Sequence, residues 1–238
     1  MKSLVFDTGP IISLVTNNLL WVLEELKERY DGEFYISPSV KKEIIDTPLK
    51  SKRFKLEALQ LMSYISKGVI KIYEPKNPKK FNLDSTKLLN LANNMFICRG
   101  VNMKIVHLAE IEALNLAKLI GADAFVVDER IIRVLVEDPK RLVKLFEKKL
   151  HCSVNIKKKF QNDFLKEVKE IKVIRSVELM ATAYDFGLFN KYADSDPKLI
   201  KNKEFKKTLL EGILWGLKLR GCAISSDEIS EVMRIKGF

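Results

Sequence analysis

Short apolar runs alternate with longer helical patterns over the first 150 residues, and this alternation limits the fold more than any other feature of the sequence. Ser3–Phe6, Glu33–Ile36 and residues 124–127 each have the length and apolar character of a strand, and a helical pattern follows each of them. Residues 71–73 are a shorter candidate strand. The pattern predicts an α/β fold, a three-layer α/β/α sandwich around a central parallel sheet.

The alternation stops near residue 150, where helical patterns at 177–190, 203–219 and 227–235 take over. Ser225 or Ser226 is the expected N-cap of the last of these helices. We therefore expect two parts, a sheet-containing domain over residues 1–148 and a small, mainly helical extension over residues 149–238. Because no Gly/Ser-rich linker separates them, the extension is expected to pack against the domain.

The charge balance indicates which class of partner the chain is expected to bind. Lys and Arg number 42 against 31 Asp and Glu, which gives a formal net charge of +11. Such an excess favours polyanions through counterion release, so nucleic acid is the expected partner. The lysine-rich surface of a protein from a hot environment would give the same excess.

The sequence also disfavours several classes of protein. No stretch approaches the roughly 20 apolar residues that span a bilayer, and acid at Asp7 interrupts the apolar run that a signal peptide would need. We expect a cytoplasmic protein that does not enter a membrane. The three cysteines (Cys98, Cys152 and Cys222) form no CxxC pair, so they predict neither a zinc site nor a disulfide framework.

Acidic residues stand at the ends of two predicted strands. Asp7 directly follows Ser3–Phe6, and Asp128 follows residues 124–127. Because ligands of such folds bind beyond the carboxyl ends of the strands, both side chains are expected on one rim of the sheet. Each has a plainer alternative: Asp7 caps the next helix, and Asp128 or its neighbour Glu129 caps a helix or pairs with a nearby arginine.

Three further acids interrupt helical patterns. Glu43 shares a helix face with the apolar Val40, although an ordinary surface glutamate is the alternative. Glu110 and Glu112 enter a strongly apolar helix and point about 200° apart, so a regular helix directs only one of them to a given ion. Glu110 shares the apolar face, where a lone carboxylate is costly, and is the expected ligand. Glu112 shares a face with Asn115, where solvation is its plainer role, and it is a close second to Glu110 as the ligand.

Carboxylates that converge from separate segments suit Mg²⁺ or Mn²⁺, which are hard ions that prefer oxygen ligands. One or two such ions promote hydrolysis of a phosphodiester by positioning a water and neutralising charge on the phosphoryl group. The candidates for this catalytic metal site are Asp7, Glu43, Glu110 and Asp128, with Glu112 and Glu129 in reserve.

Taken in order, four motifs resemble those of PIN-domain nucleases, of an archaeal type with a C-terminal helical extension. The first is a strand ending in Asp-Thr, LVFDTGPIIS at 4–13, and the second is SPSVKKEI at 37–44. The third has two glutamates before an apolar helix, AEIEALNLAKLIGAD at 109–123. The fourth is a strand ending in an acidic pair and arginine, FVVDERI at 125–131. The order and spacing of the motifs are more specific than any one of them.

The resemblance implies a small α/β sandwich, Mg²⁺ or Mn²⁺ as cofactor and endonucleolytic cleavage of RNA by the acids named above. Basic residues near the motifs are expected to attract the RNA: Lys41, Lys42, Arg130, Lys79 and Lys80. The alternative is an RNA- or ribosome-binding module that keeps the fold with little or no turnover.

The chain departs from the family in two places. Residues 46–105 are longer than the same region of its smallest members, and residues 149–238 match no part of it. The long C-terminal part argues against a minimal toxin of a toxin–antitoxin pair. Homodimers are common in the family, and the C-terminal helices, with Trp215, offer a surface for a protein partner.

Overall fold

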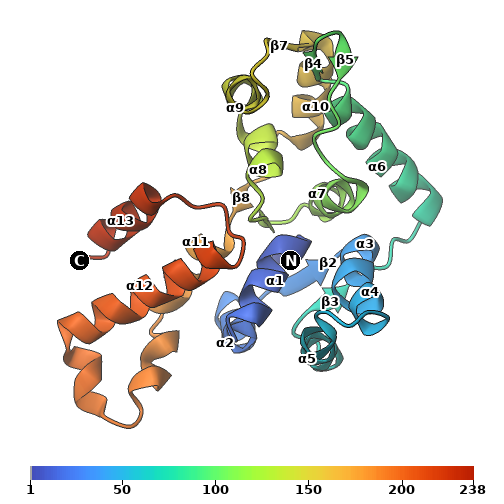
Figure 1. Ribbon diagram of the computed structural model, residues 1–238. Helices are drawn as coiled ribbons and strands as arrows, with labels where there is room; N and C mark the ends of the chain where they lie inside the picture. The colour runs from blue at the N-terminus through green and yellow to red at the C-terminus, as the bar shows by residue number, and fades with distance from the viewer. Residues whose placement is uncertain (1) are drawn as a thin grey trace.

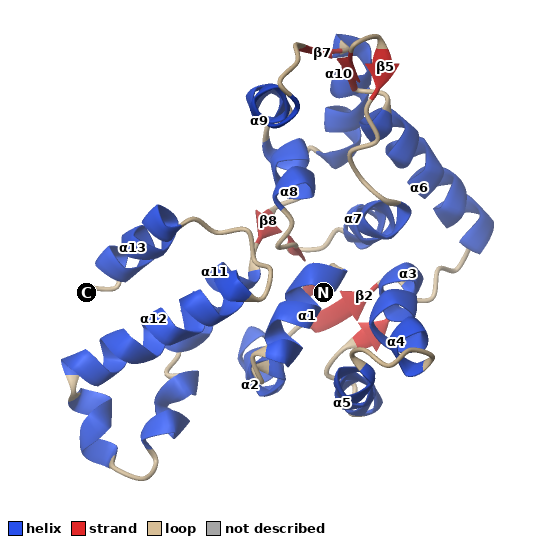
Figure 2. Ribbon diagram, viewed as in Figure 1, coloured by secondary structure: helices blue, strands red, loops and turns tan. Residues whose placement is uncertain are grey.

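A five-stranded parallel sheet forms the centre of the molecule (Figures 1 and 2), in a computed structural model that describes residues 2–238. Its strand order is β3 (Lys71–Ile72), β2 (Glu33–Ile36), β1 (Ser3–Phe6), β6 (Ala124–Val126) and β8 (Val173–Ile174). Every neighbouring pair is parallel. The expected α/β class and parallel central sheet are confirmed.

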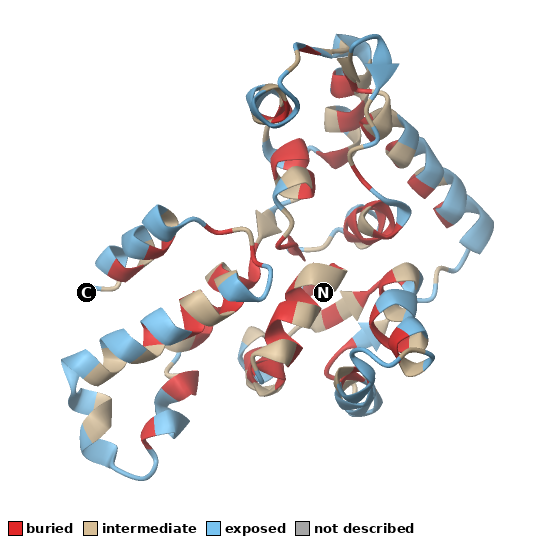
Figure 3. Cartoon of the chain, in the orientation of Figure 1, coloured by how far each residue is buried: buried red, intermediate tan, exposed pale blue. Residues whose placement is uncertain are grey.

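The middle strands β1 and β6 are buried along their whole length, so helices must cover both faces of the sheet. Helix α7 (Leu108–Ile120) contacts both of these strands. On neighbouring strands, Phe6 and Phe34 pack with ring centroids 5.4 Å apart. Figure 3 shows buried residues concentrated where the helices face this sheet. The apolar interior fixes the strand ends, and hence the acids that follow them.

The first helical region is divided in two. Helix α1 (Thr8–Thr16) starts directly after β1 and ends at Asn17, and α2 (Leu20–Tyr30) follows. Asn18 between them has φ 55°, a left-handed conformation that asparagine tolerates better than most residues. The helical pattern that follows the first strand runs without interruption over residues 11–28, and this pair of asparagines is the physical reason why the structure divides it.

After β2, the chain turns through a series of short helical segments. Ser37 caps α3 (Pro38–Lys41) by accepting a hydrogen bond from the Val40 amide at 3.2 Å. A π-helical turn, η1 (Lys42–Asp46), then leads to α4 (Thr47–Leu49) and α5 (Lys55–Ser66). Single π-helical turns recur at functional sites in proteins, and this one contains Glu43.

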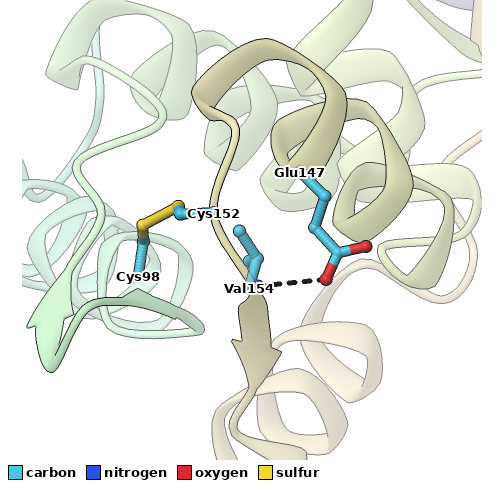
Figure 4. The surroundings of a disulfide bond; sticks show 4 residues. All are labelled: Cys98, Glu147, Cys152 and Val154. Carbon is cyan, nitrogen blue, oxygen red and sulfur yellow. Dashed lines mark hydrogen bonds between the residues drawn. A yellow bond between two sulfur atoms is a disulfide. The ribbon is translucent and has the colours of Figure 1, made fainter.

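A small antiparallel sheet lies above the central one in Figure 1. Its order is β5 (Val101–Asn102), β4 (Phe96–Cys98) and β7 (Val154–Ile156), and the helices around it are α6 (Pro78–Asn93), α8 (Arg130–Glu137), α9 (Lys140–Leu150) and α10 (Lys158–Val168). Cys98 and Cys152 form a disulfide here (Figure 4). The expectation that the cysteines form no disulfide was wrong. Pairing of β4 with β7 brings together two cysteines that are 54 residues apart, and spacing along the chain does not reveal such pairing.

The chain after residue 150 contributes a strand to each sheet, β7 to the small one and β8 to the central one. The amides of Phe125 and Val127 donate to the carbonyls of Lys172 and Ile174 at 2.8 and 2.9 Å. The expected boundary at 148/149 therefore falls between strands that share a sheet. β8 was missed because a strand of two half-buried residues shows no period in the sequence.

The helices expected near the C-terminus are present. They are α11 (Ser176–Asp185), the 3₁₀ segments η2 (Leu188–Ala193) and η3 (Pro197–Lys201), α12 (Lys203–Leu219) and α13 (Ser226–Ile235). Ser225 caps α13, and its hydroxyl accepts a hydrogen bond from the Glu228 amide at 3.1 Å. No helix in residues 2–238 has both the length and the apolar character needed to cross a membrane.

Candidate active site

The segments that carry the four motifs meet at the carboxyl edge of the central sheet, where α1, α3, α7 and α8 surround one place (Figure 1). Asp7 ends β1, Glu43 lies in η1, Glu110 lies in the first turn of α7, and Glu129 precedes α8. Helix α1 contacts η1, and α3 contacts α7. Acids from four distant parts of the sequence are thereby brought to one rim.

Asp7 is 4% exposed and stands at the N-cap of α1, but its side chain makes no capping hydrogen bond. Its Oδ1 atom has no hydrogen-bond partner. Burial raises the pKa of Asp7 to about 7; the amides of Thr8 and Gly9 oppose this shift, while Glu110 and Glu43 add to it. Asp7 therefore makes no capping hydrogen bond to the first turn of α1, and one oxygen of its buried carboxylate has no partner.

Glu110 is half-buried and faces the same cluster. Burial raises its pKa to about 7; the His107 amide lowers it, and the charges of Glu129 and Glu43 raise it. The His107 amide donates a hydrogen bond to Oε2 of Glu110 at 2.8 Å, which closes the first turn of α7 and fixes the direction of the side chain. Burial and like charge therefore raise the pKa of both Asp7 and Glu110 well above the ordinary range of a carboxyl.

Glu43 is exposed on η1, and its position is set by a residue of the first motif. The Thr8 hydroxyl donates a hydrogen bond to Oε2 of Glu43 at 2.6 Å. Thr8 therefore binds a carboxylate of another segment, which is neither the helix cap nor the water-positioning role that the sequence suggested for it. Its place directly after Asp7 was a usable signal, because a hydroxyl there lies at the same strand end.

Asp128 lies close to Asp7, but its carboxylate is already occupied. It is 1% exposed, and it accepts two hydrogen bonds from Ser176, from the amide to Oδ1 and from the hydroxyl to Oδ2, both at 2.7 Å. A Cβ added at Gly9 would lie 3.5 Å from Cβ of Asp128 and 4.0 Å from Oδ2 of Asp7, so Gly9 separates the two acids. Asp128 therefore joins β6 to the N-terminus of α11. Nothing local in the sequence pointed to Ser176, 48 residues away.

Glu129 caps α8, which is one of the roles that the sequence suggested for this residue. Its Oε2 atom accepts hydrogen bonds from the amides of Ile131 and Ile132 at 2.6 and 3.0 Å. Its charge still raises the pKa of Glu110, so it lies at the margin of the acidic cluster. We call Asp7, Glu43 and Glu110 the acidic cluster, with Glu129 at its edge.

Glu112 lies elsewhere. It is 8% exposed and more buried than Glu110, so the structure does not show the solvated Glu112 that was one of its alternatives. The reason is α6, which covers this side of α7: Asn115 donates to the Phe81 carbonyl and the Ser85 hydroxyl at 3.2 and 3.0 Å. Glu112 lines a pocket together with Lys41 and Lys42.

The basic residues expected to bind RNA lie around the cluster and this pocket. Lys41 pairs with Asp46 at 2.8 Å, and Lys42 beside it is exposed. Lys80 lines an adjoining pocket that shares the walls Tyr73, Pro75 and Phe81 with the first. Lys79 is exposed on the same turn of α6, and Arg130 is exposed at the start of α8. The structure thus brings three of the five to adjoining pockets and one to the margin of the acidic cluster.

Within residues 2–238, no three His, Cys, Asp or Glu side chains are gathered closely enough to hold a metal ion as they stand. The charges of Glu110 and Glu43 nevertheless raise the pKa of Asp7, and the charges of Glu129 and Glu43 raise the pKa of Glu110. Comparison with protein-family models, with curated proteins and with solved structures gave no match. The chemistry of the site is therefore inferred from its own residues.

Proposed function

We propose that this chain is a metal-dependent endoribonuclease with a PIN-like fold. The observation that carries the proposal is Asp7, a buried carboxylate whose Oδ1 has no partner and whose pKa is raised to about 7 beside two other acids. Burying such a group is costly unless a partner completes it. A divalent cation is the partner that would also relieve the repulsion among the three carboxylates.

The donor set fits Mg²⁺ or Mn²⁺, since every candidate atom is a carboxylate oxygen. Asp7 and Glu110 would hold the ion, with Glu43 completing the cluster. When bound, the ion supplies Lewis-acid activation and neutralises charge on the phosphoryl group. Thr8 keeps Glu43 in place through its hydroxyl, and the His107 amide orients Glu110.

Asp7 is the group that a cation would change most. Oδ1 of Asp7 accepts no hydrogen bond, and burial without a cation raises the pKa of this carboxyl to about 7. A bound cation would favour the ionised carboxylate and so release the proton from Asp7. Arg130 and Lys42, exposed near the rim, supply the attraction that an acidic site cannot give to a polyanion.

Cleavage of a labelled single-stranded RNA by the purified chain with Mn²⁺ tests this proposal. Asp7→Asn is expected to lower the rate by roughly 100-fold or more, because it removes the central carboxylate. The matched control is Asp31→Asn: Asp31 is exposed and has φ 52°, a left-handed conformation that asparagine also adopts. Cleavage that survives in Asp7→Asn overturns the proposal.

The second candidate function is an RNA-binding module without turnover. It is favoured by Asp128, whose two oxygens are both engaged by Ser176. The same assay separates the two functions. Tight binding of RNA without cleavage, in Mn²⁺ and in Mg²⁺, would support the module.

A further inference from the structure

A row of basic side chains occupies the outer face of α9, beyond the acidic cluster. Leu142 and Phe146 bury the inner face of this helix. Lys140, Lys144 and Lys148 recur every fourth residue on the opposite face, and all are exposed. Successive members are about 6 Å apart along the axis. Arg141 lies beside the row, and we call these four residues the α9 platform.

Almost no acid balances the platform. Arg141 is 3.9 Å from Glu137, while the three lysines form no salt bridge within the described part of the chain. Glu147, the one acid in α9, is half-buried, and its Oε1 accepts a hydrogen bond from the Val154 amide at 3.1 Å (Figure 4). Positive charge therefore predominates on the outer face of α9.

The helix that carries the platform is held in place by the small antiparallel sheet and by the disulfide. Helix α9 contacts β7, and β7 pairs with β4 in the small sheet. The Cys98–Cys152 disulfide joins β4 to the loop that follows α9 (Figure 4). Further exposed cations lie on the small sheet and the helices around it: Arg99, Lys149, Lys158 and Lys159. Because the helix that carries these side chains is fixed, binding of a polyanion orders less of the backbone than binding to a mobile basic segment would.

Helix α8 connects the platform to the acidic cluster. It begins after Glu129, at the edge of the cluster, and leads directly into α9 (Figure 1). Its eight residues span about 12 Å, the length of a few nucleotides. Arg130 is exposed in its first turn, at the end of the helix that adjoins the cluster. The start of α9 is therefore separated from the edge of the cluster by the length of this one helix.

We propose that the α9 platform binds the sugar–phosphate backbone of the RNA whose cleavage we propose above, outside the active site. This inference rests on the proposed function for the identity of the substrate. The exposed side chains of the platform are lysines and one arginine, which contact phosphates, and none is an aromatic residue that would stack on a base. The platform therefore gives affinity without sequence preference.

Binding is measured by fluorescence anisotropy of a labelled single-stranded RNA at several salt concentrations, in an Asp7→Asn background that prevents cleavage. The triple variant Lys140→Gln, Lys144→Gln, Lys148→Gln is expected to bind roughly tenfold more weakly. Its salt dependence should also fall by about two units of slope, because three phosphate contacts are lost. The matched control is Lys198→Gln, Lys203→Gln, Lys207→Gln, three exposed lysines of η3 and α12 that form no salt bridge within residues 2–238. If both triple variants lose affinity equally, RNA binding depends on net charge alone, and the proposal that the α9 platform binds the RNA is wrong.

Two further readouts separate the platform from the nuclease proposal. With Asp7 intact, the platform variant is expected to slow cleavage of a long RNA relative to an oligonucleotide too short to reach α9. If no RNA is cleaved by any form but the platform variant still loses binding, the nuclease proposal fails and the platform stands. If the parent chain binds vesicles of anionic lipid through these lysines but does not bind RNA, the platform is a membrane surface and the inference is wrong.

Discussion

At the scale of single residues, the buried carboxylate of Asp7 lowers the free energy of unfolding of the metal-free protein once it ionises. Its pKa rises from 3.8 in a model peptide to about 7 in the fold, so the folded chain holds this proton more tightly than the unfolded chain does. The proton's contribution to stability is complete below pH 4. It is lost as the pH rises through about 7, because the unfolded carboxyl then ionises freely while the folded one resists. Above that range the metal-free protein carries the full penalty of a buried charge.

Asp7→Asn is accordingly expected to stabilise the metal-free protein. At pH 8 in the presence of a chelator, its free energy of unfolding should exceed that of the parent by about 1–3 kcal/mol. The fall in stability between pH 4 and 7 should also shrink, and Asp31→Asn should leave both quantities unchanged. Urea denaturation at several pH values measures this. A variant that is less stable than the parent at pH 8 would show that Asp7 already has a stabilising partner.

The two glutamates of α7 are expected to differ in importance. Glu110 faces Asp7 and Glu43, whereas Glu112 lines the pocket with Lys41 and Lys42. Glu110→Gln should therefore reduce kcat/KM for RNA roughly 100-fold, and Glu112→Gln less than about tenfold. The opposite order would place the ion on the other side of α7. Circular dichroism of both variants confirms that the helix is retained.

At the scale of elements, the sequence was informative where a segment carries its own signal. β1, β2 and β6 were predictable from apolar runs, and α12 from its helical period. Glu110 and Glu43 were predictable from acids in apolar surroundings. β8 has two residues, and Ser176 owes its role to Asp128, which is 48 residues earlier, so neither had a local signal. The relative burial of Glu110 and Glu112 was reversed because α6 covers a face of α7 that a single helix would expose to water.

The Cys98–Cys152 disulfide is expected to stabilise the small antiparallel sheet. Replacing Cys98 and Cys152 together by Ser is expected to lower the free energy of unfolding by about 2–4 kcal/mol, since the bond closes a loop of 54 residues in the unfolded chain. A reducing agent should destabilise the parent and leave the double variant unchanged. Alkylation of the denatured, unreduced parent should label Cys222 alone. Equal stability of parent and variant would show that the bond does not form in solution.

At the scale of the whole molecule, the part of the chain after residue 148 completes the central sheet through β8. Removing residues after 148 deletes β8, exposes the backbone edge of β6, and leaves the buried Asp128 without Ser176. We expect a chain ending at residue 148 to lose cooperative unfolding, because both consequences leave buried polar groups unpaired. Thermal melts followed by circular dichroism measure this. A shortened chain with a sharp transition and full activity would show that the extension is an independent part.

The central claim is that the carboxylates of the acidic cluster, which come from three segments, form one cation site on the rim of this sheet. Anomalous diffraction from crystals soaked in Mn²⁺ tests it most directly. The result expected is a peak within about 2.2 Å of oxygens from both Asp7 and Glu110, absent from crystals of Asp7→Asn. Crystals with Mn²⁺ bound only elsewhere, at a concentration that supports RNA cleavage, would contradict the claim.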